Sequence, residues 1–307
     1  MENIIDRVID YAHYCLWPFS VFCVLDFAGR CPVIELPEAL TLSAQLNKTI
    51  RGKRVAEVTA GHSPHKLTWY YGDRARYSAL LVGKIIDKGM AFGALVQIKA
   101  GDSAILFGDG VNLRFHERNE SRAEKHQLLV EFEDYSAISA SVQMYGGLGC
   151  FREGELDNRY YKAAKEKPSP LSDEFDGEYF ARLISAPEVQ KLSAKAFLAT
   201  EQRIPGIGNG VLQDILFQAR GHAKKKIDAF SDREKKALFK AIKGVLGEIV
   251  RCGGRDTEID LFGCPGGYKT KLSKKTAGKP CPNCGSLIVK ENYLGGSIYY
   301  CPKCQKP

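Results

Sequence analysis

The sequence lacks the features that mark several classes of protein. It has no apolar run of about eighteen residues, so no transmembrane helix is predicted. Glycine and proline, at 30 and 13 of 307 residues, show neither a collagen-like repeat nor a low-complexity bias. With 44% hydrophobic and 26% charged residues, the composition is that of a soluble globular protein and excludes disorder as the main state. The length suits one large domain or two to three ordinary ones.

The first 33 residues also lack the pattern of a secretory signal. Their apolar stretch, residues 14–25, is too short to span a bilayer, the residues before it are acidic, and no small-residue cleavage site follows. Two interpretations stay open for this extension, residues 1–33. It is either an additional helix or the result of a start codon assigned upstream of the true one, which would then lie at Val33.

The last four of the ten cysteines form two C-x-x-C pairs separated by sixteen residues. Each pair brings two thiolates to one metal ion from a tight turn, so the spacing predicts a structural Zn²⁺ in a zinc-ribbon β-hairpin. Two disulfides or unrelated thiols are the alternative. Thiolates held for zinc, together with six further cysteines, favour a reducing compartment, the cytoplasm. The four predicted ligands are Cys281, Cys284, Cys301 and Cys304.

Residues 34–155 predict one helix followed by a β-rich region. The helix is expected over residues 37–52, because Pro37 suits a helix start and Gly52 suits a helix end. Short β-rich runs follow, separated by Gly, Asp and Asn at hairpin spacing, which indicates an antiparallel β-sandwich or barrel. The runs are RVAEV, GALVQIKA, SAILFG, QLLVEFED and AISASVQMY.

Residues 156–262 are predicted to be helical, and residues 263–307 to be a basic linker and the zinc finger. One helix is expected to begin at Ser172 and another after Asn209. A third should begin at the capping box of Ser231 and Glu234 and continue to residues 253–254, because its apolar residues keep a helical period. The whole chain is therefore expected to have an α+β fold.

Positive charge is concentrated in residues 220–280. This segment holds 16 Lys or Arg against 7 Asp or Glu, a net of +9, whereas the whole chain carries +8. A solvated helix face with a flexible basic linker would explain the excess. A basic helical region beside a zinc ribbon favours a nucleic-acid partner instead.

The segment RIPGIGNG, residues 203–210, directly precedes a predicted helix. Glycines without a Cβ let a phosphate approach, and the free N–H groups of a helix start point at it. Asn209 would add a side-chain donor. By itself the segment is equally a tight turn with a good N-cap; beside the basic region, it indicates a phosphate-binding turn between two helices.

Four motifs together resemble the formamidopyrimidine-DNA glycosylase and endonuclease VIII family. They are ELPEA at 35–39, PLSDEF at 170–175, IPGIGN at 204–209 and the four-cysteine ribbon, and they occur in family order from about residue 34 to the end. The resemblance implies an N-terminal β-sandwich, a helix–two-turns–helix element and a zinc finger that bind damaged duplex DNA. It also implies base flipping, attack on the sugar by the N-terminal amine, and strand cleavage through a Schiff base.

The resemblance assigns catalytic roles to three residues. Ile34 holds the position of the attacking amine, Glu35 matches the acid that handles protons at the deoxyribose, and Lys88 matches a lysine that assists elimination. Glu38 matches a second acid at the helix start. A merely structural role is the alternative for both acids, since carboxylates near a helix N-terminus stabilise the helix; for Lys88 the alternative is simple exposure.

Further residues match positions that contact DNA. His126 and Lys195 align with such positions, Asn209 matches the phosphate-binding asparagine, and Tyr145 is the residue nearest to the family's wedge side chains. Surface roles are the alternative for His126 and Lys195. A shape-filling wedge would enter the space left by the flipped base.

Three departures affect the chemistry. The family's first residue is usually proline, whereas this chain has Ile34, preceded by 33 residues that make its nitrogen an amide without a lone pair for attack. The three wedge positions read Asp109, Tyr145 and Gly146, and the finger arginine is replaced by Gly296.

The sequence therefore predicts a base-excision repair DNA glycosylase with AP lyase activity, acting on damaged bases or abasic sites in double-stranded DNA. A catalytically impaired zinc-finger protein that binds such DNA is the alternative, and a zinc-ribbon RNA-binding module is a more distant one. We expect a monomer in the cytoplasm, associated with the nucleoid, and no membrane partner.

Overall fold

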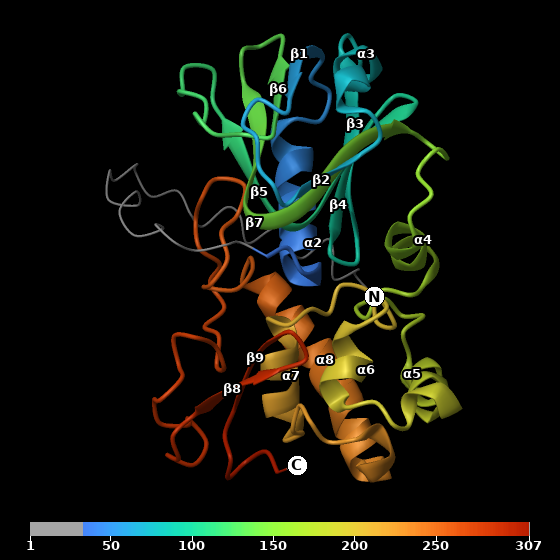
Figure 1. Cartoon of the computed structure of the whole chain (residues 1–307), viewed down its shortest axis with the longest axis vertical. Helices are drawn as coiled ribbons and strands as arrows, with labels where there is room; N and C mark the ends of the chain where they lie inside the picture. Colours follow the sequence, from blue (N-terminus) through green and yellow to red (C-terminus); the bar gives the residue numbers. More distant parts are fainter. Residues whose placement is uncertain (1–32, 307) are drawn as a thin grey trace.

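The computed structural model describes residues 33–306, and the predictions for the preceding extension lie outside these residues. Figure 1 shows two parts along the longest axis of the molecule, with a β-sheet and its helix at one end and a group of helices at the other. The C-terminal hairpin lies beside the helices. None of the helices in residues 33–306 is long and apolar enough to cross a membrane.

The first part contains two helices and seven strands in one hydrogen-bonded sheet. The strand order is β1-β6-β7-β5-β4-β3, and β2 pairs in parallel with β7, whereas the other pairs are antiparallel. The elements are α2 (Leu36–Thr49), β1 (Val55–Ala60), β2 (Thr68–Tyr71), α3 (Tyr77–Leu81), β3 (Ile86–Phe92), β4 (Leu95–Ala100), β5 (Ser103–His116), β6 (Leu128–Phe132) and β7 (Ala137–Arg152).

The antiparallel pairing is as predicted, and all seven strands are joined in one hydrogen-bonded set. They are joined through β5 and β7, which have 14 and 16 residues; the first half of β7 pairs with β6 and the second half with β2. Each predicted β-rich run overlaps a strand, and the predicted helix is α2. Two strands, β2 and β3, were missed.

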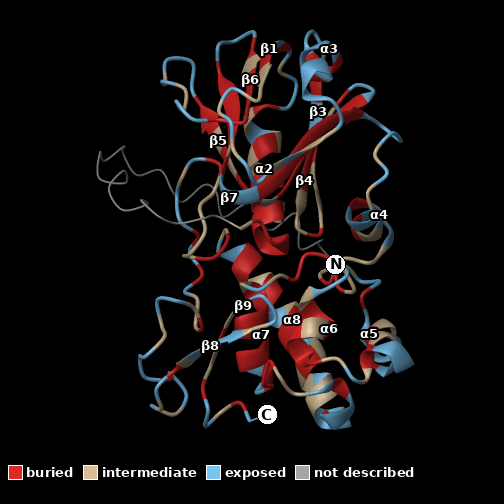
Figure 2. Ribbon diagram, viewed as in Figure 1, coloured by how far each residue is buried: buried red, intermediate tan, exposed pale blue. Residues whose placement is uncertain are grey.

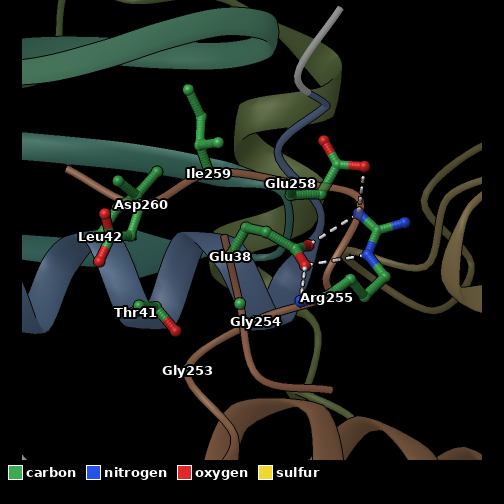
Figure 3. A pocket seen from close by; sticks show the side chains of 10 residues that line it. Glu38, Thr41, Leu42, Gly253, Gly254, Arg255, Glu258, Ile259 and Asp260 are labelled. Atoms are coloured by element: carbon green, nitrogen blue, oxygen red, sulfur yellow. Dashed lines mark hydrogen bonds and ion pairs between the residues drawn. The ribbon is translucent and has the colours of Figure 1, made fainter. Parts of the chain in front are cut away.

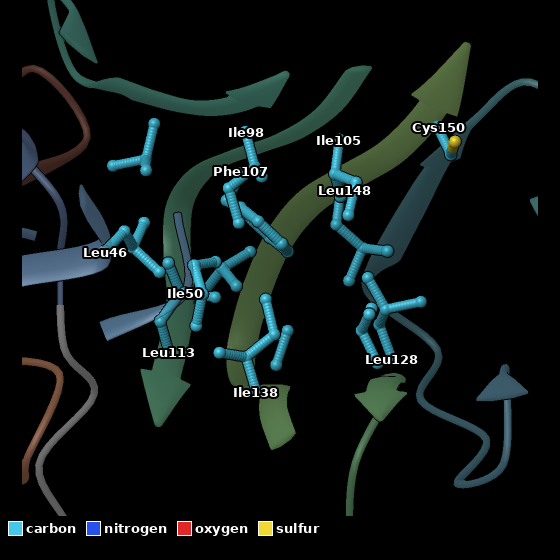
Figure 4. Packing of buried hydrophobic residues seen from close by; sticks show 14 of the residues in the cluster. Leu46, Ile50, Ile98, Ile105, Phe107, Leu113, Leu128, Ile138, Leu148 and Cys150 are labelled. Atoms are coloured by element: carbon cyan, nitrogen blue, oxygen red, sulfur yellow. The ribbon is translucent and has the colours of Figure 1, made fainter. Parts of the chain in front are cut away.

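A hydrophobic core fills the space between α2 and the sheet. Leu46 and Ile50 from α2 and its C-cap meet Ile98, Ile105 and Phe107 from the central strands, and all five are almost fully buried. Figure 4 shows these side chains pointing toward one another between the helix and the strands. Burial of such residues stabilises this part by about 1.5–3 kcal/mol each.

The second part is helical, as predicted. Its helices are α4 (Arg159–Glu166), α5 (Gly177–Ser185), α6 (Ala194–Ala199), α7 (Val211–Ala219) and α8 (Asp232–Arg251). The capping box of Ser231 and Glu234 begins α8 as expected. The expected helix at Ser172 is wrong by a turn or more: α5 begins at Gly177, because the carboxylate of Asp176 caps it by accepting the N–H of Tyr179.

A second hydrophobic core lies among these helices, and the chain enters it at the start of α2. Ile34 packs into the core of the sheet, whereas Leu36 packs into the core of the helices. Figure 2 shows α2 and α7 mostly in the colour of buried residues. Glu35, between these two apolar residues, therefore lies where the two cores meet.

The C-terminal hairpin consists of β8 (Val289–Tyr293) and β9 (Gly296–Tyr300), as the zinc-ribbon pattern predicts. It packs on α7: Phe217 of α7 shares a small core with Cys281 and Cys301. The tip of the hairpin is thereby held close to the turn that precedes α7.

Candidate active site

Glu35 is held by the backbone of the turn before α7. It is the N-cap of α2, in extended conformation, and only 2% exposed. Its Oε1 accepts a hydrogen bond of 2.7 Å from the N–H of Gly210, and its Oε2 accepts one of 2.7 Å from the N–H of Val211. These two N–H groups belong to the start of α7, so the carboxylate takes the place that an anion would take at a helix N-terminus.

The environment of Glu35 shifts the pKa of its carboxyl group. Burial raises the pKa of Glu35 above its ordinary value. The Arg255 guanidinium, whose Nη1 lies 3.5 Å from Oε2, and the two backbone hydrogen bonds lower this pKa, while the neighbouring Glu38 raises it. Burial dominates, so Glu35 keeps a proton to higher pH than an exposed glutamate does.

The glycines of residues 203–210 serve this contact. A Cβ on Gly208 would lie 2.4 Å from Oε1 of Glu35, and a Cβ on Gly206 would lie 2.6 Å from the Cβ of Leu36. The sequence predicts that these glycines and the following N–H groups face a phosphate. Instead, the described glycines let α2 approach the turn, and Glu35 uses the N–H groups of Gly210 and Val211.

Asn209 and Lys195 lie together against the tip of the zinc-finger hairpin. Asn209 donates to the carbonyl of Ser297 at 3.0 Å, and the Nζ of Lys195 donates to the carbonyl of Tyr293 at 2.6 Å. A Cβ on Gly296 would lie 3.3 Å from the Nζ of Lys195 and 3.5 Å from the Nδ2 of Asn209. Burial lowers the pKa of Lys195. The residues predicted to bind phosphate thus surround the position of the missing finger arginine.

Lys88 lies on β3, the strand that leads to the turn beside Gly206. It is exposed on β3, five residues before Gly93, and a Cβ on Gly93 would lie 2.9 Å from the nitrogen of Gly206. Five residues of strand cover about 16 Å. The turn between β3 and β4 therefore approaches the site, and the role of Lys88 in elimination stays a prediction.

His126 is buried beside the loop between β1 and β2. Its ring stacks on His62 at 4.6 Å with an interplanar angle of 9°. Its Nδ1 lies 2.7 Å from the carbonyl of Ala123, and its Nε2 has no hydrogen-bond partner among residues 33–306.

Tyr145 lies on a bulge of β7. Between the pairs Asp109–Gly146 and Val111–Val142, three residues of β7 oppose one residue of β5, and the extra residues are exposed. Tyr145 is 37% exposed and its ring lies 6.2 Å from that of Trp69, which is 53% exposed. The predicted wedge residue therefore lies exposed at an irregular point of the sheet.

Residue 34 offers its nitrogen only as part of a peptide bond with Val33. The N–H of Val33 donates to Oε2 of Glu258 at 2.8 Å, and its carbonyl accepts from Nη2 of Arg255 at 3.3 Å. Nothing in the sequence singles out Arg255 and Glu258, because charged residues after a helix end carry no local signal of burial.

The four C-terminal cysteines meet as predicted. Their Sγ atoms all lie within 4.8 Å of one another, with 3.9 Å between Cys281 and Cys304 and 3.4 Å between Cys284 and Cys301. Four thiolates about 2.3 Å from a zinc ion in a tetrahedron lie about 3.8 Å apart, so the donor set fits one metal ion. Hydrogen bonds from Ser286 lower the pKa of the Cys284 thiol, which favours the thiolate that binds metal.

Known proteins similar to this chain belong to the same family that the sequence motifs indicate. No family model matches the chain. The formamidopyrimidine-DNA glycosylase of Listeria monocytogenes is 27% identical over 281 residues, and that of Heliobacterium modesticaldum is 28% identical over 282 residues. Each alignment covers 89% of this chain and 99% of the relative. The resemblance to formamidopyrimidine-DNA glycosylases is confirmed.

Solved structures of these glycosylases share the fold. The enzyme of Thermus thermophilus superposes with a TM-score of 0.73 at 24% identity, covering 88% of this chain and 98% of that one. The Lactococcus lactis enzyme, solved in complex with DNA containing an abasic site, superposes with a TM-score of 0.75 at 23% identity, covering 89% and 100%. The parts that align thus include nearly the whole length of both glycosylases.

Proposed function

We propose that this protein is a base-excision repair DNA glycosylase that acts on damaged bases in duplex DNA. The observation that carries the proposal is the position of Glu35. A buried acid directly follows the residue whose nitrogen is the attacking group in the family. It accepts hydrogen bonds from the turn that contains IPGIGN, in a chain similar to these glycosylases over 89% of its length.

The chemistry assigned to Glu35 is proton transfer at the deoxyribose. An acid works best in this role when its pKa lies near the working pH, and burial moves the pKa of Glu35 in that direction. The attacking group would be a free amine at Ile34, because an α-amine with a pKa near 8 is partly neutral at pH 7. AP lyase activity would follow from the same amine through a Schiff base.

DNA binding is assigned to the face that includes the turn before α7 and the finger hairpin. Asn209 and Lys195 would bind phosphates there, and His126 and Tyr145 would contact the duplex from the sheet. Lys88 remains a candidate from the sequence alone. The four cysteines would hold one structural Zn²⁺, which fixes the hairpin and takes no part in the reaction.

Binding without catalysis is a second candidate, and two observations favour it. The nitrogen of residue 34 is an amide, and the preceding Val33 is held by hydrogen bonds through both its N–H and its carbonyl. Gly296 also places no cation at the finger tip. A chain of this kind would recognise damaged or abasic DNA and leave it intact.

Base release decides between the two. Duplexes carrying a formamidopyrimidine, 8-oxoguanine, an oxidised pyrimidine or an abasic site are incubated with the 307-residue chain and with a chain that begins at Ile34. The glycosylase predicts release of at least one damaged base, lost in Glu35→Gln and kept in Glu57→Gln, which changes an exposed glutamate of β1. Tight binding of abasic DNA by both forms, without release or cleavage, would establish the binding protein instead.

A further inference from the structure

Arg255 is the one cation within reach of Glu35 among the described ion pairs, and nothing in the sequence singles it out. It follows the glycines that end α8 and is only 3% exposed. An arginine buried to this degree is rare unless its charge is paired. Figure 3 shows its guanidinium between Glu38 of α2 and Glu258 of its own loop.

The guanidinium reaches three carboxylates. With Glu38 it forms a two-pronged contact, in which Nε and Nη2 each donate at 2.9 Å to a different oxygen. Its Nη1 lies 3.5 Å from Glu35, and its Nη2 lies 3.9 Å from Glu258. Asp260, which lines the same pocket, accepts instead from Gln45 and from the amides of its own loop.

The charges of this cluster do not balance. Two buried carboxylates, Glu35 and Glu38, and the partly buried Glu258 share one guanidinium, so the fully ionised cluster would carry a net charge of −2. Burial raises the pKa of Glu35 and of Glu258, and Arg255 lowers both. An arginine stays protonated in proteins, so it is the fixed charge against which these acids ionise.

The turn before α7 leaves room for this side chain. A Cβ on Gly210 would lie 1.6 Å from Nη1 of Arg255 and 3.0 Å from Oε1 of Glu35. The last glycine of the turn is therefore needed by the arginine as well as by the acid. The same guanidinium donates to the carbonyl of Val33 and thereby fixes the chain next to Ile34.

We propose that Arg255 is the positioning residue of Glu35: its guanidinium holds Glu35 on the Gly210 and Val211 amides and sets how readily Glu35 ionises. Without it, Glu35, Glu38 and Glu258 would have no cation as a partner among the ion pairs of residues 33–306. The part of this inference that concerns catalysis rests on the proposed function. The effect of Arg255 on the ionisation of Glu35 can be measured even in a chain without activity.

The deciding experiment is the pH dependence of urea unfolding of the full 307-residue chain, between about pH 5 and 8. Glu35 and Glu258 bind protons more tightly in the folded than in the unfolded chain, so stability falls as pH rises above the unfolded pKa toward the folded pKa. Removing Arg255 extends this fall to higher pH. Each additional proton that folded R255M retains should make its folding equilibrium constant fall with pH more steeply than that of the wild type. The extra fall is up to tenfold per pH unit for each such proton.

Three variants test whether the effect comes from the charge of Arg255 acting on Glu35. R255K keeps a charge and should follow the wild-type pH dependence, R255M/E35Q should lose the part of the extra slope that Glu35 causes, and R251M, which changes an exposed arginine at the end of α8, should run parallel to the wild type. If R255M does not fold, R255M/E38Q replaces it. This variant also removes the charge of Glu38, which would otherwise be buried without its bidentate partner Arg255. Parallel curves for the arginine-free variant and the wild type would overturn the proposal.

The rate of base release tests whether Arg255 positions Glu35 for catalysis. In a chain that releases a damaged base, R255K should lower the single-turnover rate about tenfold, because a lysine cannot reproduce the planar fork, while affinity for an abasic duplex changes less than about threefold. An R255K rate equal to the wild type would overturn positioning. A chain that shows the extra slope in R255M but releases no base would refute the proposed function and keep the effect of Arg255 on Glu35.

Discussion

Gly206 is the residue on which the approach of α2 to the turn depends, and Gly206→Ala is expected to be the most damaging small substitution in this region. Its φ is +85°, a left-handed value that costs a residue with a Cβ about 1–2 kcal/mol. The added Cβ would lie 2.6 Å from the Cβ of Leu36 and 2.8 Å from the carbonyl carbon of Gly93. Because backbone lies on one side, the clash has no flexible side chain to relieve it.

The magnitude follows from these two costs. Overpacking of a filled site costs about 1–3 kcal/mol, so the free energy of unfolding should fall by about 2–5 kcal/mol in total. The carbonyl of Gly206 also accepts the N–H of Leu36 at 2.9 Å. A shift of the turn would lengthen that bond and draw the Gly210 and Val211 amides away from Glu35, so base release should fall as well.

Urea unfolding of wild type and variant measures the effect, and Gly244→Ala is the matched control. Gly244 lies in α8 with nothing within 4 Å of its added Cβ, so alanine should stabilise the chain by about 0.4–1 kcal/mol. Gly93→Ala should act like Gly206→Ala, since its Cβ would lie 2.9 Å from the nitrogen of Gly206. A Gly206→Ala variant within about 0.5 kcal/mol of wild type would refute this account of the turn.

Three further predictions concern metal, DNA and the amine. Metal analysis should find about one zinc ion per chain, lost in Cys284→Ser and kept in Cys252→Ser, an exposed cysteine outside the cluster; a zinc-free wild type that binds DNA would contradict the metal site. Asn209→Ala should weaken binding to undamaged and abasic duplexes alike, with an affinity that falls steeply with salt in both proteins, and unchanged affinity for both duplexes would remove Asn209 from the interface. Borohydride should crosslink the chain that begins at Ile34 to abasic DNA and leave the 307-residue chain nearly uncrosslinked, because only the former has a free amine at that position; equal trapping would direct attention to Lys195 or Lys88.

The sequence predicted the elements whose signals are local. The capping box of Ser231 and Glu234, the apolar period of α8 and the paired cysteines each depend on residues a few positions apart, and all three are confirmed as structure. The resemblance of the chain to these glycosylases also rested on short motifs in order. Local spacing is preserved on folding, which is why it can be interpreted without a structure.

Two local predictions were incomplete for a different reason. The helix expected at Ser172 begins at Gly177, because Asp176 offers a cap that competes with the earlier serine. The length of β5 and β7 was not predicted: both continue through the wedge positions Asp109 and Tyr145, so that the strands are hydrogen-bonded in one set. In both cases the pairing partner of a backbone group, which the sequence does not specify, decided the outcome.

The candidate site itself was decided by tertiary structure. Glu35 could be selected from the sequence, but its hydrogen bonds to Gly210 and Val211 join residues about 175 positions apart. The same is true of Arg255, which reaches Glu38 across 217 positions and becomes a buried charge only because two cores meet around it. Burial and electrostatic coupling depend on distances in space, and these are set by the packing of α2 between the sheet and the helices and not by any spacing along the chain.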